Sequence, residues 1–113
     1  MEDCLFCKII NKQIKSEFVY EDDELICIND IHPQAPVHLL IIPKKHISTI
    51  LDVSGEDEML IGKMARTAAT ISKQFNINES GFRLIFNCNK DGGQTIYHIH
   101  LHLIGGKRLK WTQ

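Results

Sequence analysis

Residues 97–104 of this 113-residue chain read Tyr-His-Ile-His-Leu-His-Leu-Ile, and two glycines follow them. Apolar residues alternate strictly with histidines here, which is the pattern of a β-strand whose two faces differ. His98, His100 and His102 therefore share one face, at backbone spacings of about 6.5 Å. Because that spacing is too wide for simple side-by-side ring contact, another group must orient each ring. The opposite, apolar face is expected to pack against a helix.

The segments before this strand predict an α+β domain. We expect a short helix over residues 4–14, strands over 17–21, 24–29, 37–43 and 82–88, loops over 30–36 and 89–94, and a long helix over 56–75. The long helix carries one apolar stripe, formed by Leu60, Met64, Ala68, Ile71 and Phe75. Ser54 and Asp57 ahead of it resemble a capping box. Because most connections are short, we expect one domain spanning residues 1–113, an antiparallel sheet whose apolar face the long helix covers.

The composition excludes several classes of protein. A hydrophobic fraction of 43% is too high for a disordered chain, and a net charge of −1 gives no basic field for nucleic acid or an anionic membrane. No apolar run approaches the roughly 20 residues that span a bilayer. The sequence starts Met-Glu-Asp, without a signal-type apolar segment after it. We expect a cytoplasmic protein with no nucleic-acid or membrane partner, whose four cysteines are thiols or metal ligands.

The three alternating histidines admit several kinds of chemistry. Imidazole titrates near neutral pH, so a histidine can act as a nucleophile, a general acid or base, or a metal ligand. A metal site formed by all three is one interpretation. A merely polar, solvent-facing side of the strand is another, although three histidines in alternation make it less favoured.

Four segments together resemble the histidine triad (HIT) family. Residues 98–104 resemble its His-φ-His-φ-His-φ-φ signature, and Gly92-Gly93-Gln94-Thr95-Ile96-Tyr97 precedes that signature as in the family. Residues 30–36, followed by His38, resemble its nucleotide-binding loop and strand, and residues 43–46 resemble its Pro-Lys-Lys-His segment. The resemblance extends from about residue 4 to 111. Gly105-Gly106 and Trp111 resemble the Hint branch, the purine nucleotide phosphoramidases, more than the diadenosine polyphosphate hydrolases.

The resemblance implies a catalytic role for several residues. His100 would be the nucleophile that attacks the α-phosphorus of a nucleoside 5′-phosphoramidate, forming a nucleotidyl-histidine that water hydrolyses. His102 would contact the phosphate, and His38 would support the triad by a hydrogen bond. Thr95 stands where the branch usually has serine, and its hydroxyl would contact the phosphate or the leaving amine. As plain structural residues, His38 would be hydrogen-bonded core and Thr95 an ordinary loop residue.

The resemblance also implies a nucleotide pocket. Asp30 would accept hydrogen bonds from the ribose hydroxyls, and Asn87, on the strand before the triad, would lie near the phosphate and ribose. The apolar positions that would line the base pocket are Phe6, Ile9, Ile14, Ile28, Ile31 and Leu40. The structural alternatives are a turn-capping Asp30, a structural amide at Asn87, and apolar residues that only build the core.

Cys4 and Cys7 form a Cys-x-x-Cys pair, which alone could be half a zinc site, a redox pair or two small buried residues. A redox pair would need a thioredoxin-like βαβ context, which the sequence does not predict. Bacterial proteins of the resembled family combine this pair with two histidines, here His46 and His98, to hold a structural zinc ion that catalysis does not require. Cys27 and Cys88 fall in predicted strands and are expected in the core.

The sequence therefore favours a purine nucleoside phosphoramidate hydrolase that binds AMP- or GMP-type nucleotides. The alternatives are a dinucleoside polyphosphate hydrolase, which Gln94-Thr95 also suits, and a nucleotide-binding regulatory module with incidental turnover. The resemblance further implies a homodimer formed through the long helix and an edge strand. Ile61 and Ala65 on the helix and the apolar last strand support it. Residues 107–113 resemble a tail that reaches the partner's site.

Overall fold

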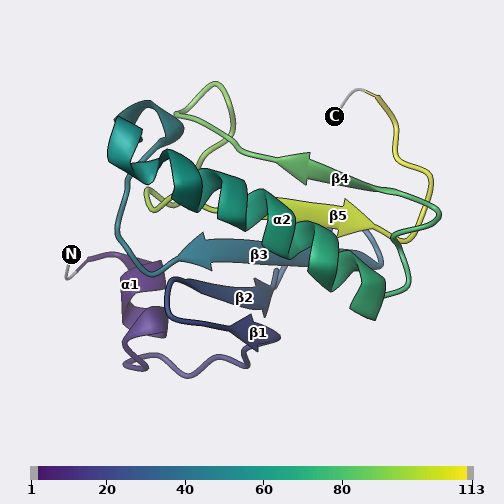
Figure 1. Ribbon diagram of the computed structural model, residues 1–113, viewed down its shortest axis with the longest axis horizontal. Helices are drawn as coiled ribbons and strands as arrows, with labels where there is room; N and C mark the ends of the chain where they lie inside the picture. Colours follow the sequence, from purple (N-terminus) through teal and green to yellow (C-terminus); the bar gives the residue numbers. More distant parts are fainter. Residues whose placement is uncertain (1–2, 112–113) are drawn as a thin grey trace.

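The computed structural model describes residues 3–111, which form one antiparallel sheet of five strands and two α-helices (Figure 1). In chain order the elements are α1 (Leu5–Ile10), β1 (Tyr20–Glu21), β2 (Leu25–Asn29), β3 (Val37–Pro43), two 3₁₀ turns (Ile50–Asp52 and Gly55–Asp57), α2 (Glu58–Gln74), β4 (Phe82–Ile85) and β5 (Leu101–Gly105). The strand order is β1-β2-β3-β5-β4, and each neighbouring pair is antiparallel. The predicted α+β class is confirmed.

Helix α2 covers one face of this sheet (Figure 1). Its stripe of Met64, Ala68 and Ile71 is buried, and it packs on alternate residues of β2, β3 and β5. Ser54 and Asp57 form the expected capping box, which encloses a 3₁₀ turn directly before the helix. The long helix is therefore held on the sheet by apolar burial, as its sequence pattern predicts.

The opposite face of the sheet carries a smaller apolar cluster under α1. Phe6 and Ile9 of this helix pack on residues of β2 and β3 that point away from α2, namely Ile26, Ile28, Leu40 and Ile42. β2 and β3 are thus covered on both faces, which explains why residues 39–42 form an unbroken aliphatic run.

Strand β5 begins at Leu101, four residues later than predicted. Ile41 pairs with Leu101, so extending the register would set Ile99 opposite Pro43. Proline has no N–H to donate, and the ladder ends there. Ile99 instead donates its N–H to the carbonyl of Ile47 at 2.7 Å. His98 and His100 therefore lie just before the strand, and only His102 lies within it.

Other predicted elements are also too long, and β1 covers only Tyr20–Glu21 of the strand predicted over residues 17–21. α1 ends at Ile10, because Lys12 adopts a left-handed backbone conformation with φ of 63°. β4 ends at Ile85, so Asn87 and Cys88 lie in the following connection and not on a strand. Cys88 is partly exposed, whereas Cys27 in β2 is buried as expected.

The edges of the sheet are β1 and β4 (Figure 1). The last strand, β5, is internal and pairs on both sides, so its apolar character does not support an interface between subunits. Within residues 3–111, no helix combines the length and apolar content needed to cross a membrane.

Candidate active site

One cavity of about 420 Å³ gathers all of the predicted nucleotide-binding residues. It lies beside α1, the end of β2, the loop before β5, and the two later histidines of the triad. The predicted residues that line it are Phe6, Ile9, Ile14, Ile28, Asp30, Ile31, Leu40, Asn87, Thr95, His100 and His102. His38 does not line it and is buried behind His102. One wall is apolar and the other carries hydrogen-bonding groups, which suits a ligand with a flat base and a polar tail.

The loop between β4 and β5 is held in place by side-chain amides. Asn87 donates from Nδ2 to the carbonyl of Gly92 at 2.7 Å. The buried side chain of Gln94 donates to the carbonyl of Ser48 at 2.8 Å and accepts from the N–H of Asn89 at 2.9 Å. These bonds fix the backbone that presents Thr95 to the cavity.

Only one of the two ring nitrogens of His100, Nδ1, has a hydrogen-bond partner among the described residues. Its Nδ1 lies 2.8 Å from the carbonyl oxygen of His98. A carbonyl only accepts, so Nδ1 carries the proton and Nε2 keeps its lone pair. Phe6 packs edge-on against the ring, with the centroids 5.0 Å apart. Burial lowers the pKa of His100, which keeps the imidazole neutral.

His102 and His38 form a hydrogen-bonded pair beside His100. Nε2 of His38 lies 2.9 Å from Nδ1 of His102 and 3.4 Å from a carboxylate oxygen of Asp30. Burial lowers the pKa of His38 and lowers that of His102 to about 4, so both rings are neutral near pH 7. The rings of His100 and His102 tilt toward each other, with their centroids 5.0 Å apart. The expectation that neighbouring triad rings would not meet is wrong for this pair.

His98 points away from the cavity into a cluster with Cys4, Cys7 and His46. The four possible ligand atoms all lie within 4.8 Å of one another. Nδ1 of His98 is 3.3 Å from Sγ of Cys4 and 3.6 Å from Sγ of Cys7, and 3.1 Å from Nδ1 of His46. In a tetrahedral zinc site the sulfur and nitrogen ligand atoms lie about 3.5 Å apart, and the two nitrogen ligand atoms lie about 3.3 Å apart. The cluster therefore has the dimensions of a metal site.

The groups around the cluster also suit a metal ion. The second nitrogen of His98 donates to the carbonyl of Pro43 at 2.7 Å, and that of His46 lies 3.3 Å from Oγ of Ser48. Both histidines thus direct Nδ1 inward and hold Nε2 with an oxygen, the usual arrangement behind a metal-bound imidazole. Burial lowers the pKa of His98 to about 4, which leaves it neutral. Burial, with the thiol of Cys4, raises the pKa of Cys7 to about 11, so only a bound cation would favour the thiolate.

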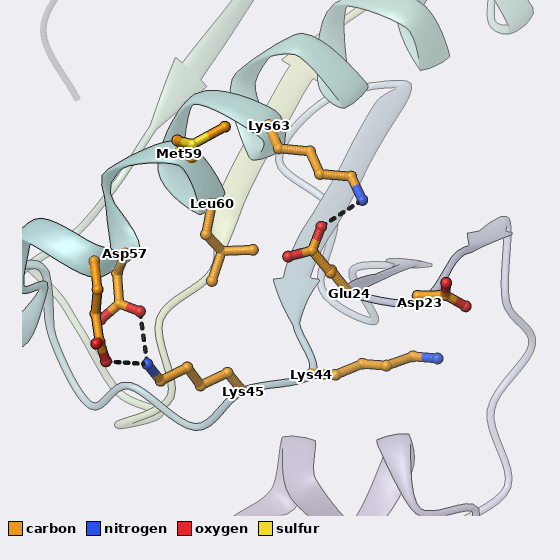
Figure 2. A pocket seen from close by; sticks show the side chains of 9 residues that line it. Asp23, Glu24, Lys44, Lys45, Asp57, Met59, Leu60 and Lys63 are labelled. Carbon is orange, nitrogen blue, oxygen red and sulfur yellow. Dashed lines mark hydrogen bonds and ion pairs between the residues drawn. The ribbon is translucent and has the colours of Figure 1, made fainter.

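A hollow of about 520 Å³ beside the start of α2 lacks comparable chemistry (Figure 2). Its lysines are paired with carboxylates: Nζ of Lys45 is 2.6 Å from Asp57, and Nζ of Lys63 is 2.8 Å from Glu24. Figure 2 shows these pairs joining α2 to the turn between β1 and β2, and the 3₁₀ turn Gly55–Asp57 to the segment after β3. They connect elements of the fold and leave little free charge for a ligand.

Several cavity residues were not predicted from the sequence. Leu5, Lys15, Ser16, Asn29, His32, Gly93 and Ile96 also line the cavity. Most of them are immediate neighbours of predicted residues. Because a loop turns several consecutive side chains toward one space, adjacency to predicted residues was the available signal. Gln94 was noted only as a marker of family branch, and its role in holding the loop follows from contacts distant in sequence.

Comparisons with known proteins agree with this geometry. Residues 3–110 match the family model described as "Scavenger mRNA decapping enzyme C-term binding". A HIT family hydrolase from Legionella pneumophila Philadelphia 1 superposes with a TM-score of 0.95 at 48% identity, covering 97% of this chain and 98% of that one. The chain belongs to the histidine triad family.

Two further members of the histidine triad family extend the comparison. A histidine triad protein from Clostridium difficile superposes with a TM-score of 0.95 at 39% identity, covering 100% of this chain and 98% of that one. The purine nucleoside phosphoramidase of Escherichia coli (strain K12) is 51% identical over 108 residues, which are 96% of this chain and 91% of the relative. The predicted family and fold are therefore confirmed.

Proposed function

We propose that this chain is one HIT domain that hydrolyses purine nucleoside 5′-phosphoramidates. The observation that carries the proposal is the ring of His100, neutral, with Nδ1 held by a carbonyl and the lone pair of Nε2 left to act as a nucleophile at the cavity. The 51% identity to a purine nucleoside phosphoramidase, over most of both chains, supports the choice of a P–N bond as the bond cleaved.

The reaction takes two steps on His100. The Nε2 lone pair attacks the α-phosphorus, the P–N bond breaks, and the amine leaves with a proton that the Thr95 hydroxyl or water supplies. Water then attacks the phosphorus of the nucleotidyl-histidine and returns a proton to the group that protonated the amine. The P–Nε2 bond breaks, and the nucleoside monophosphate and neutral His100 are released. His102 and Asn87 donate hydrogen bonds to the phosphate oxygens. Asn87 uses one of its two side-chain N–H groups to bond the carbonyl of Gly92, and the other remains for the ligand.

The nucleoside occupies the apolar side of the cavity. Phe6, Ile9, Ile28 and Leu40 form a slot for the flat base, and Ile14 and the 85% exposed Ile31 flank its opening. A slot without a fixed polar partner holds adenine and guanine alike. Asp30 accepts from the ribose hydroxyls through carboxylate lone pairs that the N–H of His32, 2.8 Å from Oδ1, leaves available.

The metal of the cluster is proposed to be zinc. Two thiols and two imidazoles are ligands that Zn²⁺ favours, and the interatomic distances suit a tetrahedron. Zinc bound there would supply structural cross-linking, fixing the start of α1 to the segments that carry His46 and His98. No step of the reaction uses it.

The protein is further proposed to be a cytoplasmic homodimer whose partners are purine nucleotides and not nucleic acids or membranes. A reducing compartment suits the thiol pair, and the net charge of −1 gives no field for polyanions. The exposed edge strand β4 and the partly buried flank of α2 at Ile61 and Ala65 offer a surface for the second copy. In this proposal residues 107–113 reach the partner's cavity; residues 112 and 113 lie outside the described part of the chain.

The test compares two substrates on the same purified, metal-analysed protein. Turnover of adenosine 5′-phosphoramidate should exceed turnover of diadenosine polyphosphate, and guanosine 5′-phosphoramidate should also be cleaved. Preferential cleavage of the polyphosphate would assign the chain to the other branch. Binding of AMP without cleavage of either substrate would make it a regulatory nucleotide-binding module.

A further inference from the structure

The main-chain amide of Gln34 donates a hydrogen bond to Nδ1 of His38 at 3.0 Å. An amide N–H can only donate, so Nδ1 must present its lone pair. A neutral imidazole carries one ring proton, and that of His38 therefore sits on Nε2. The loop amide thus determines the tautomer of a buried histidine that does not line the cavity.

The tautomer of His38 determines the tautomer of His102. Nε2 of His38 lies 2.9 Å from Nδ1 of His102, so the His38 proton is donated there and Nδ1 of His102 accepts it. The proton of His102 must then occupy its own Nε2. The reverse arrangement would place an N–H of His38 against the N–H of Gln34, and a His38 lone pair 3.4 Å from the carboxylate of Asp30. Both contacts are repulsive.

We propose that the main-chain amide of Gln34 is a positioning group that acts through His38 to make His102 a hydrogen-bond donor to the substrate phosphate. The proposal rests on the phosphoramidase function proposed above. His102 and His100 line the same cavity with rings 5.0 Å apart, and they need opposite properties there. His100 must offer a lone pair to phosphorus, whereas His102 must offer an N–H to an anionic oxygen.

Hydrogen bonds within the loop of residues 30–36 orient the main-chain N–H of Gln34 toward His38. Gln34 lies between Pro33 and Ala35-Pro36, and its side chain donates to the carbonyl of His32 at 3.0 Å. The N–H of His32 in turn bonds the carboxylate of Asp30 at 2.8 Å, and the N–H of Asp30 bonds the carbonyl of His38 at 3.0 Å. The loop therefore closes back onto the strand residue whose ring it orients. Burial keeps that ring neutral, so it has a single proton to place.

Ring-¹⁵N-labelled histidine allows a direct test, because the shifts of Nδ1 and Nε2 identify which nitrogen carries the proton. In the wild-type protein both His38 and His102 should be protonated on Nε2, with resonances assigned through His38→Gln and His102→Gln. A His38 or His102 ring protonated on Nδ1 at pH 7.5 would overturn the proposal. This measurement needs no turnover, so it remains decisive even if the phosphoramidase function fails.

A matched pair of variants tests the consequence for catalysis. Gln34→Pro removes the N–H, whereas Gln34→Ala keeps it and removes only the side chain. With adenosine 5′-phosphoramidate, Gln34→Pro should lower kcat about three- to tenfold, the scale of one net hydrogen bond, with KM changed less than about twofold. Gln34→Ala, which loses only the side-chain bond to the carbonyl of His32, should retain a kcat clearly above that of Gln34→Pro. Equal kcat values for the two variants, with both folded by circular dichroism, would contradict the proposal.

A second pair covers the case in which Gln34→Pro does not fold. His38→Gln can place an amide N–H near the position of Nε2, whereas His38→Asn is too short to reach His102. His38→Gln should retain a kcat at least about threefold above that of His38→Asn, because only the former can still donate to Nδ1 of His102. Equal losses in the two variants would show that donation from this position does not matter.

Discussion

The three triad histidines are evenly spaced in sequence, yet each ring is held by a different kind of partner. Nδ1 of His98 faces two thiols and another imidazole, Nδ1 of His100 faces a carbonyl, and Nδ1 of His102 faces the ring of His38. The chemistry of a histidine follows from which nitrogen is engaged and by what. This difference is what allows three similar residues to take the three separate tasks proposed for them, namely metal ligation, nucleophilic attack and hydrogen-bond donation.

Replacement of the nucleophile should separate catalysis from binding. His100→Ala should abolish turnover of adenosine 5′-phosphoramidate, because it removes the ring nitrogen proposed to attack the phosphorus. AMP affinity should change by less than about tenfold, or about 1.4 kcal/mol, since the base and ribose contacts lie elsewhere. Steady-state kinetics and calorimetric titration measure the two effects. His102→Ala is the comparison variant and should lower the rate less.

Covalent trapping gives the complementary check. Rapid quenching with a substrate carrying labelled AMP should leave an acid-labile, base-stable adduct, which peptide mapping should place on His100. Near wild-type turnover by His100→Ala, or label on another residue, would refute the assignment.

The sequence allowed most of the site's residues to be predicted, but not how its rings are oriented. The eleven predicted nucleotide-cavity residues named above line one cavity, and the four predicted metal ligands form one cluster; their roles stay predictions. Ring orientation depends on contacts such as that of His38 with His102, 64 positions apart. No local pattern encodes such a contact. The same limitation applies to Gln34, whose backbone acts and whose side-chain identity therefore gives no signal.

At the level of elements, the short helix α1 joins the metal cluster to the nucleotide cavity. Sγ of Cys4 accepts from the N–H of Cys7 at the start of the helix, and both thiols belong to the cluster. Two residues after Cys4, Phe6 contacts the ring of His100. A helix of six residues has little stability of its own, so the apolar contacts and the proposed metal cross-link would hold it.

Loss of a thiol should therefore reduce both metal content and stability. Cys4→Ala should carry much less than the roughly one zinc ion per chain expected of the wild type purified without chelator, and it should melt at a lower temperature. Elemental analysis and thermal denaturation measure the two quantities. Cys88→Ala is the matched control, because Cys88 is also a partly exposed free thiol but lies outside the cluster. A metal-free wild-type protein of full stability would exclude the zinc proposal.

Element boundaries were predicted less well than element types, and Pro43 illustrates the reason. Alternation over residues 97–104 predicted one continuous strand, and the alternation of buried apolar side chains does persist at Ile99, Leu101 and Leu103. A ladder, however, also needs donors on the neighbouring strand, and proline supplies none. Which residue would stand opposite Pro43 depends on sheet register, which a single strand's sequence does not specify.

Across the whole molecule, burial of neutral histidines should make stability depend on pH. The pKa of His102 is about 4 in the folded chain against 6.5 ordinarily, and that of His38 is also lowered. Between pH 4 and pH 6.5 the unfolded chain binds protons that the folded chain does not. The folded state therefore keeps its full stability above pH 6.5 and loses stability on acidification toward pH 4. The free energy of unfolding should fall by at most about 1.4 kcal/mol per pH unit for each such group.

Urea denaturation at several pH values between 7.5 and 4.5 measures this slope. His102→Gln removes one of the groups and should give a shallower dependence than the wild type. Both proteins should be compared with their metal content known, because acid also releases metal from thiols and imidazoles. An identical slope in the two proteins would mean that His102 does not titrate as its burial requires.

The arrangement of the sheet leaves an edge that suits the proposed homodimer. β4 is an edge strand, and its Leu84 is 36% exposed on the face of the sheet that α2 covers; Ile61 and Ala65 of α2 are half-buried. An unpaired edge beside apolar side chains favours pairing with a second copy.

Light scattering at micromolar concentration should give twice the mass of the chain, and Leu84→Lys should shift the protein toward the monomer. Leu51→Lys, at a 74% exposed leucine in the 3₁₀ turn Ile50–Asp52, should not. The mass of a single chain for the wild type would contradict the dimer.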